Sequence, residues 1–338
     1  MSLGWGIVGI GRHADRFVAQ AISHAPDTQL VAVCSRDIGR AQDFAARHQA
    51  NRAYSSFDQM LQDPAIDVLY IATPNKLHLE QTVAAAQAGK HVFCEKPMAL
   101  SVAECEKMIR VCADSGVKLG IDLQNRYHPA HIETHRLISS GEAGEINFIR
   151  AQYAHGRSRN AARTAGWRSD PNAAGAGAIA GTGIHPIDLL RYLTGSEIVE
   201  VRALLDEKPP QLLDTMAYVI LSFANGITGI VVSGLLVPRS DDDAVVYGSR
   251  LRITCKGTVG MPLRGELIVE GEEMNRRETY PTDNPGIGLY VKAVGAFNQC
   301  IRNNTAPLSS GYDGLEMVRI VAAIQESSRT GKAVKISR

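Results

Sequence analysis

Two oppositely charged side chains follow a short apolar run in the segment Cys94-Glu95-Lys96-Pro97. Burial at a strand end and a nearby cationic ring both lower the pKa of a lysine. Such a lysine can exchange a proton with a substrate hydroxyl at neutral pH. The residues alone leave a second interpretation open, an ordinary ion pair between Glu95 and Lys96.

A glycine-rich turn, Gly9-Ile10-Gly11-Arg12-His13-Ala14, follows the first predicted strand and opens the first predicted helix. It is the dinucleotide fingerprint with alanine at the third glycine position. Gly9 permits the tight turn, Gly11 lets the backbone approach a pyrophosphate, and the helix N-terminus supplies N–H donors. The turn therefore predicts cofactor contacts at Gly9, Gly11, Arg12 and His13.

The end of the second predicted strand selects the cofactor. An acidic residue there would bind the adenosine ribose hydroxyls, but this chain has Ser35 followed by Arg36. Both side chains suit a 2′-phosphate, which favours NADP. NAD stays possible if Asp37 turns inward, whereas Asp37 as the cap of a helix starting near Ile38 leaves the phosphate site to Arg36.

A third loop, Thr73-Pro74-Asn75 followed by His78, comes after the third strand. Loops at the carboxyl edge of a parallel sheet face the ligand, so we expect cofactor contacts there and at Glu95 and Lys96.

The order of these pieces resembles the glucose–fructose oxidoreductase/inositol dehydrogenase (Gfo/Idh/MocA) family. The resemblance includes Glu95-Lys96-Pro97, Trp167-Arg168, the run from Gly183 to Asp188 and the closing Asp313-Gly314-Leu315. It implies a Rossmann domain, a second domain with a large open sheet, and NAD(P)-dependent oxidation or reduction of a carbohydrate or polyol.

By this resemblance Lys96 matches the family's catalytic lysine and His185 its catalytic histidine. Asp188 lies three residues after His185 and would orient the imidazole or contact the substrate. Asn125 would line the cofactor site. The remaining substrate candidates are Arg126, Tyr127, Trp167, Arg168 and Thr182, with His128 a weaker one.

The chain departs from the family at Gly181, where many members have an aspartate four residues before the histidine. Thr182 can form a hydrogen bond but cannot take a proton at neutral pH. We therefore expect Lys96 and His185 to carry the acid–base chemistry, on a substrate that need not be inositol.

Other polar clusters favour plainer interpretations. The arginines of residues 156–164 (Arg157, Arg159 and Arg163) suit a solvated loop as well as a substrate loop. Asp241-Asp242-Asp243 is expected to be a solvated turn, so we predict no metal site. The six cysteines lack CxxC spacing and are expected to be reduced thiols in a cytoplasmic protein.

Strand–helix alternation over the first third of the chain predicts a doubly wound parallel sheet with helices on both faces. After about Glu145 successive strands predict an open, mostly antiparallel sheet, with the turn Ala224-Asn225-Gly226 as a hairpin signal. The fold is thus α/β, with an NAD(P)-binding domain over 1–122 and a substrate-binding and oligomerisation domain over 123–338. The helices near the C-terminus are expected to pack back on the assembly.

Composition limits the partners. The chain has 338 residues and a formal net charge of +1, so no strong field attracts nucleic acid or an acidic membrane. Its apolar runs are too short to span a bilayer. Alternating apolar residues in the second half leave a sheet face that needs cover, which predicts a homodimer or homotetramer. That face is assigned to Val219, Leu221, Phe223, Ile230 and Val232.

These observations favour an NADP- or NAD-dependent oxidoreductase acting on a sugar, a sugar derivative or a polyol. Two alternatives remain open: an NAD-dependent glycosidase on the same scaffold and a non-catalytic redox sensor. The first would retain its cofactor without net turnover. The second would tolerate loss of Lys96 and His185.

Overall fold

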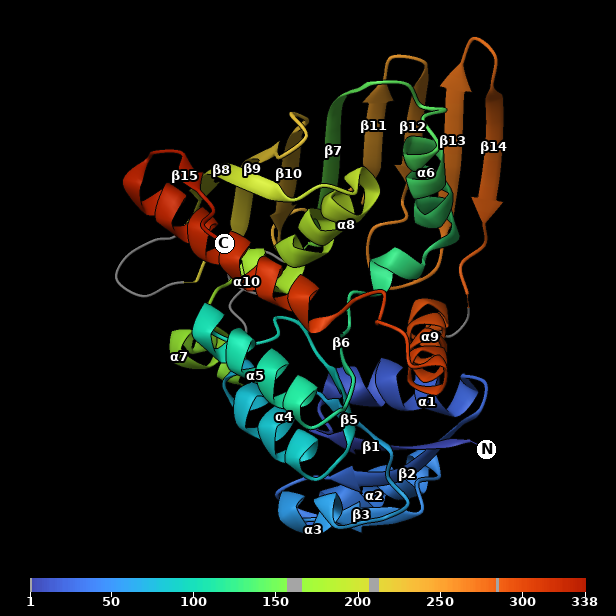
Figure 1. The fold of residues 1–338 in the computed structure, drawn as a ribbon, viewed down its shortest axis with the longest axis vertical. Coiled ribbons are helices and arrows are strands. Elements are labelled where there is room, and N and C mark those ends of the chain that lie inside the picture. The colour runs from blue at the N-terminus through green and yellow to red at the C-terminus, as the bar shows by residue number, and fades with distance from the viewer. Residues whose placement is uncertain (1, 157–165, 207–212, 284–285) are drawn as a thin grey trace. The chain divides into compact units, whose positions relative to one another are not determined.

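The computed structural model describes residues 2–156, 166–206, 213–283 and 286–338. The chain forms two compact units (Figure 1). Unit 1 comprises Met1–Gln124 and Pro285–Leu315, and unit 2 comprises Asn125–Asn284 and Glu316–Arg338. The arginines Arg157, Arg159 and Arg163 lie outside the described residues.

Unit 1 is built on a six-stranded parallel sheet. Its strand order is β3 (Arg52–Tyr54), β2 (Thr28–Cys34), β1 (Leu3–Val8), β4 (Val68–Ile71), β5 (His91–Cys94) and β6 (Leu119–Ile121). The central strands are apolar and buried on both faces, as parallel strands covered by crossover helices must be. The predicted doubly wound sheet is confirmed.

Helices cover this sheet on two sides. The first begins as a π-helical turn over Ala14–Val18 and continues as α1 (Ala19–His24). Figure 1 shows α4 beside α5 and α9 beside α1, and these pairs are in contact. The unit's helices are α1, α2 (Ile38–His48), α3 (Phe57–Leu61), α4 (His78–Gln87), α5 (Val102–Asp114) and α9 (Gly288–Asn303).

The late helix α9 completes the core of unit 1. The Trp5 indole donates a hydrogen bond to Asn298 Oδ1 at 3.1 Å. Phe297 packs edge-on against Trp5, with ring centroids 6.1 Å apart, and lies 4.9 Å from Phe93. Burial of these rings stabilises unit 1 with a segment almost 300 residues from its first strand.

Unit 2 contains a nine-stranded sheet that is antiparallel except where β10 runs parallel to β7. The hairpin expected at Ala224-Asn225-Gly226 joins β9 and β10, and Gly226 takes a φ of +87° in the turn. The order is β14 (Asn275–Tyr280), β13 (Gly265–Gly271), β12 (Leu251–Lys256), β11 (Ala244–Gly248), β7 (Ile146–Ala154), β10 (Thr228–Gly234), β9 (Met216–Phe223), β8 (Ile198–Leu205) and β15 (Val334–Lys335).

One face of this sheet carries helices. Helix α8 (Ile184–Thr194) packs on β7 and β10, and α6 (Pro129–Ser139) packs on α8 and β12 (Figure 1). The short α7 (Pro171–Ala174) also belongs to this unit, and α10 (Gly311–Thr330) begins in unit 1 and continues in unit 2. The sequence patterns do not predict α6, β11 or β14.

The prediction of which apolar residues lie on the exposed face of this sheet is partly wrong. Val219, Leu221 and Phe223 point toward the helices and are buried. Neighbouring residues of a strand point to opposite faces, so the exposed set is the alternate one. Its large apolar members are Leu204 on β8, Tyr218 and Ile220 on β9, and Ile230 on β10, with exposed fractions of 63%, 46%, 46% and 38%.

Two chemical expectations can be checked directly. All six cysteines are free and buried, in line with the sequence. Within the described residues, no helix combines the length and the apolar composition needed to cross a membrane.

Candidate active site

The glycine-rich turn has the shape that a dinucleotide requires. Gly9 adopts a φ of +93°, and a Cβ atom there would come within 2.7 Å of the Ala72 carbonyl carbon and the Thr73 nitrogen. Gly11 is exposed, and a Cβ atom on it would meet nothing within 4 Å. Gly9 therefore has no room for a side chain. Gly11 leaves open space at a helix N-terminus, which fits a cofactor pyrophosphate.

The two charged residues that follow β2, Arg36 and Asp37, have different environments. Asp37 Oδ1 accepts a hydrogen bond from the Arg40 main-chain N–H at 3.1 Å, so Asp37 caps α2 as expected. Ser35 is half-buried and its hydroxyl accepts from the Asp37 N–H at 3.4 Å. Arg36 is exposed.

The loop after β4 is tied to the segment after β5. The His78 ring is fully buried, with Nε2 3.0 Å from the Thr73 carbonyl oxygen and Nδ1 3.1 Å from the Pro97 carbonyl oxygen. Thr73 donates a hydrogen bond to Gln81 at 2.6 Å. His78 thus joins two main-chain segments, including the one that carries Lys96, while Pro74 and Asn75 start the next helical turn.

Glu95 links the glycine-rich turn to Lys96. Its Oε1 atom lies 2.8 Å from His13 Nε2 and accepts a hydrogen bond from the Tyr70 hydroxyl at 2.6 Å. Its Oε2 atom accepts from the Lys96 main-chain N–H at 3.3 Å. Burial alone raises the pKa of Glu95, but His13 and Tyr70 outweigh it and hold this pKa at about 2. Burial lowers the pKa of His13, yet the Glu95 carboxylate raises it by more.

Asp122 is a further polar residue of this cluster. Its side chain is 1% exposed, and Oδ2 lies 2.5 Å from the Tyr70 hydroxyl. Burial and the charge of Glu95 raise the pKa of Asp122 to about 7. Neither Tyr70 nor Asp122 is predicted from the sequence. A polar ring inside an apolar strand and an acid at the next strand end are the signals that could have identified them.

In unit 2, the segment before His185 is held by Asp214. Its carboxylate accepts main-chain hydrogen bonds from Gly177 at 2.8 Å and Ile179 at 2.7 Å. Thr182 is buried and donates to the Ala178 carbonyl oxygen at 2.8 Å, so its hydroxyl stabilises the helix itself. Gly181 is exposed, and a Cβ atom there would meet nothing within 4 Å.

His185 lies in the first turn of α8 and is 6% exposed. Its ring meets the Tyr153 ring edge-on, with centroids 5.6 Å apart. Burial raises the pKa of Tyr153 to about 12, so the phenol is neutral at physiological pH. The Tyr153 ring packs against the imidazole, a contact that the sequence does not predict.

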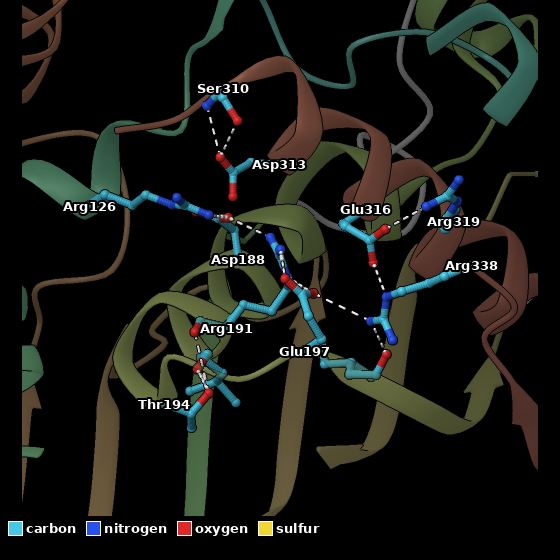
Figure 2. A network of polar contacts seen from close by, with 12 residues as sticks. Arg126, Asp188, Arg191, Thr194, Glu197, Ser310, Asp313, Glu316, Arg319 and Arg338 are labelled. Carbon is cyan, nitrogen blue, oxygen red and sulfur yellow. Dashed lines mark hydrogen bonds and ion pairs between the residues drawn. The ribbon is translucent and has the colours of Figure 1, made fainter. Parts of the chain in front are cut away.

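Asp188 and Arg126 form a buried ion pair (Figure 2). Arg126 donates from Nε to Oδ2 at 2.9 Å and from Nη2 to Oδ1 at 2.5 Å, and both side chains are almost fully buried. Arg191 lies 3.8 Å from the same carboxylate and binds Glu197. The structure therefore brings two predicted site residues together as each other's partners.

The other residues predicted for the site in unit 2 have structural contacts. Asn125 Oδ1 accepts from the Gly260 N–H at 3.1 Å, and Tyr127 is buried. His128 caps α6 by accepting from the Ala130 N–H at 3.1 Å. The Arg168 guanidinium stacks over the Trp167 ring at 4.4 Å.

The interpretation of residues 241–243 as a solvated turn is wrong. Asp243 is buried and bound by both terminal nitrogens of Arg150, at 2.9 and 3.2 Å. Asp242 is also buried, and it accepts from the Ala154 N–H at 3.3 Å. Tertiary partners remove two of the three carboxylates from solvent, and Asp241 alone is exposed.

Comparisons with known proteins agree with this architecture. Residues 3–123 match the model of an oxidoreductase family with an NAD-binding Rossmann fold, and residues 131–254 match the GFO/IDH/MocA C-terminal domain. The chain is 32% identical to the uncharacterized oxidoreductase ORF334 of Rhizobium meliloti, with 97% of each protein covered. The chain belongs to the GFO/IDH/MocA oxidoreductase family.

Two other comparisons concern proteins with named activities. This oxidoreductase is 28% identical to D-xylose 1-dehydrogenase (NADP(+)) 2 of Haloferax volcanii, over 98% of its own length and 99% of the relative. It superposes with a TM-score of 0.88 on the crystal structure of aldose-aldose oxidoreductase from Caulobacter crescentus complexed with glycerol. That pair shares 27% identity, with 99% of this chain and 100% of the other covered.

Proposed function

We propose that this oxidoreductase transfers hydride between the nicotinamide of NADP(H) and a carbinol or carbonyl carbon of a sugar, a sugar derivative or a polyol. The relatives named for xylose and aldose chemistry support the substrate class. The contact that carries the proposal lies within unit 1. His13 of the glycine-rich turn binds Glu95, and Glu95 binds the main chain of Lys96.

The cofactor supplies the hydride acceptor or donor. Lys96 takes the hydroxyl proton in the oxidative direction and returns it in the reductive one. His185 shares this acid–base role, and its orientation against Tyr153 holds the imidazole ready for a hydrogen bond to the developing alkoxide. Gly9, Gly11 and the helix N-terminus would hold the pyrophosphate of the cofactor.

A panel of sugars and polyols, each with NADP⁺ and with NAD⁺, tests the activity through the absorbance of the reduced nicotinamide. We expect net cofactor reduction with at least one aldose or polyol. Protein that retains cofactor tightly, cleaves glycosides and never reduces added cofactor would be a glycosidase on this scaffold. Protein that does neither would contradict the proposed function.

Arg36 is proposed to select NADP over NAD. Asp37 is committed to capping α2, whereas the Arg36 guanidinium is exposed beside Ser35. A hydrogen bond to a charged group contributes about 1.5–3 kcal/mol, or roughly 10- to 150-fold in affinity. Arg36→Ala should therefore lower the NADPH-to-NADH affinity ratio at least about tenfold. Arg40→Ala, at another exposed arginine of the same segment, should leave the ratio unchanged.

The exposed apolar residues of the second sheet are proposed to join copies of this chain into a homodimer or homotetramer. They are Leu204, Tyr218, Ile220 and Ile230. The sheet register aligns Leu204 with Tyr218, and Ile220 with Ile230, across three adjacent strands. An apolar surface of this kind is uncommon on monomers. Sedimentation should show an oligomer that Ile220→Lys dissociates, and a monomer in the unmodified protein would contradict the assembly.

The free, buried cysteines suit a cytoplasmic location.

A further inference from the structure

Four side chains of unit 1 form one continuous polar chain. Asp122 Oδ2 is 2.5 Å from the Tyr70 hydroxyl oxygen, which is 2.6 Å from Glu95 Oε1. Glu95 Oε1 is in turn 2.8 Å from His13 Nε2. Tyr70 and Asp122 are each 1% exposed, so the inner half of the chain has no access to bulk solvent.

The strand register explains why these groups meet. Ile71 of β4 pairs with Cys94 of β5, and Cys94 pairs with Ile121 of β6. Glu95 and Asp122 are the next residues on adjacent parallel strands and therefore lie at the same level of the carboxyl edge. Tyr70 reaches both from β4.

The number of hydrogens in this chain is fixed by its chemistry. A phenol has one hydrogen, and it can donate to one carboxylate only. The other oxygen–oxygen contact, at 2.5 or 2.6 Å, needs a hydrogen of its own, because two unprotonated oxygens repel at that distance. One of the two carboxyl groups must therefore be protonated.

The proton is assigned to Asp122 by its surroundings. Glu95 has the His13 imidazole beside it and accepts the Lys96 N–H, and both contacts favour its charged form. Asp122 is more deeply buried than Glu95 and faces that negative charge across Tyr70, which raises its pKa to about 7. Asp122 then donates to Tyr70, and Tyr70 donates to Glu95.

We propose that Asp122 carries a buried proton and acts, through Tyr70 and Glu95, as a positioning residue. The presence or absence of this proton determines the net charge of the polar chain near Lys96. With the proton in place, Glu95 is the one charged carboxylate of the polar chain, and it lies beside the His13 imidazole, whose pKa it raises. Loss of the proton adds one negative charge beside Lys96 and favours the ammonium form, which cannot act as a base. The link to catalysis rests on the proposed function, in which Lys96 moves the substrate proton.

Apart from His13 and Lys96, the groups that interact with this cluster supply no cation within the part of the chain that the structure describes. The titratable groups with an electrostatic effect on Asp122 or Glu95, or affected by Glu95, come from the glycine-rich turn, β4, the start of α4 and β5: His13, Tyr70, His78, Cys94 and Lys96. His78 is fully buried and its pKa is lowered by burial, and burial raises the pKa of Cys94. Both are therefore neutral near pH 7.

A bound cation is the competing explanation. One ligand atom from each of His13, Glu95 and Asp122 can lie within 4.8 Å of the others, which is close enough to share a metal ion. A metal would require Asp122 to be deprotonated and Tyr70 to move out from between the two carboxylates. The infrared experiment below distinguishes the two cases.

Infrared difference spectroscopy locates the proton without any use of activity. Wild-type protein minus Asp122→Asn should show the C=O band of a neutral carboxylic acid below neutral pH, and this band should disappear as the pH rises above neutral. Asp114→Asn, at an exposed aspartate of α5, is the matched control and should not remove the band. A wild-type protein without the band, or with a band that survives Asp122→Asn, overturns the assignment. Protein that shows the band only after treatment with a chelator also overturns it, in favour of a metal site.

Nuclear magnetic resonance tests the effect on Lys96. In ¹³C-lysine-labelled protein, the Lys96 Cε signal is assigned by its loss in Lys96→Arg. Its titration midpoint should be lower in Asp122→Asn than in wild type, by about half a pH unit or more, since the variant cannot acquire the negative charge. Tyr70→Phe should alter the carboxylic acid band, because Asp122 loses its acceptor. An unchanged Lys96 midpoint in Asp122→Asn contradicts the positioning role even if the infrared band behaves as expected. Failure of the sugar and polyol panel with both spectroscopic results intact would instead remove the proposed function alone.

Discussion

Two buried carboxylates, Asp188 in unit 2 and Asp122 in unit 1, have partners of different kinds. Asp188 is bound by Arg126, so its charge is compensated by a group that does not titrate near neutrality (Figure 2). Glu316 in the same figure and Asp243 elsewhere in unit 2 are also bound by arginine. In unit 1, Asp122 is bound by a phenol and faces another carboxylate. Arginine pairs fix a charge, whereas the phenol leaves Asp122 free to gain or lose a proton in the physiological range.

This difference matches the chemistry proposed for each unit. Proton transfer needs groups whose pKa lies near the working pH. Substrate orientation needs groups that stay where they are and keep one charge. The cluster around Lys96 has the first property. The Arg126–Asp188 pair, whose aspartate follows His185 by three residues on α8, has the second.

The largest expected effect comes from breaking the fixed pair of unit 2. Arg126→Met leaves the buried Asp188 carboxylate with Arg191, 3.8 Å away, as its cationic partner among the described residues. Removing one partner of a buried ion pair costs about 3–5 kcal/mol, and we expect a loss of about 3 kcal/mol in the free energy of unfolding.

Denaturant unfolding measures this loss. The double variant Arg126→Met/Asp188→Leu should recover part of it, because no unpaired charge remains. A single variant as stable as the wild type would show that the pair is not a fixed structural element.

Lys96→Met should have the next largest effect, on turnover rather than stability. Loss of a general acid–base group lowers the rate by roughly 100-fold or more, which corresponds to about 2.7 kcal/mol. Lys107→Met, at an exposed lysine of α5, is the control. Steady-state kinetics with unchanged cofactor affinity would support the role, and near wild-type turnover would remove Lys96 from the mechanism.

The pH dependence of stability should differ between wild type and Asp122→Asn. The folded-state pKa of Asp122 is raised from an ordinary value of 3.8 to about 7. Its contribution to stability is therefore fully present below about pH 4 and is lost as the pH rises to about 7. Relative to the variant, the wild type should lose about 1.4 kcal/mol in the free energy of unfolding for each pH unit across that interval. Parallel unfolding curves for the two proteins would contradict a shifted Asp122.

The smallest effect is expected at the position where this chain departs from the family pattern. Gly181→Asp places a side chain into open space, so the free energy of unfolding should change by less than about 0.5 kcal/mol. The added carboxylate should alter which sugars or polyols react. A large loss of stability, measured by thermal unfolding, would show that the position is not open.

Much of the fold follows from local patterns. The predicted doubly wound sheet is present, and the helix expected to start near Ile38 begins at that residue with Asp37 as its cap. Buried parallel strands and amphipathic helices carry strong periodic signals. Local patterns do not predict β14, because its charged residues Arg276 and Arg277 are typical of a solvated loop. Its strand conformation depends on pairing with β13.

The candidate site is predictable only in part. Lys96 and Gly9 belong to short motifs whose chemistry is visible in their spacing. Asp122 and Tyr70 are separated by 52 positions, and their contact depends on the register of three strands. The pairing of Arg126 with Asp188, 62 positions apart, has the same tertiary origin.

The most direct test of the account is the pH dependence of single-turnover hydride transfer in wild type and Asp122→Asn, with a substrate from the panel. The rate of oxidation should rise with pH as Lys96 loses its proton. In Asp122→Asn this rise should occur at lower pH, by about half a unit or more, because residue 122 then cannot acquire a negative charge near Lys96. Superimposable profiles would contradict the claim that unit 1 controls proton transfer through Asp122.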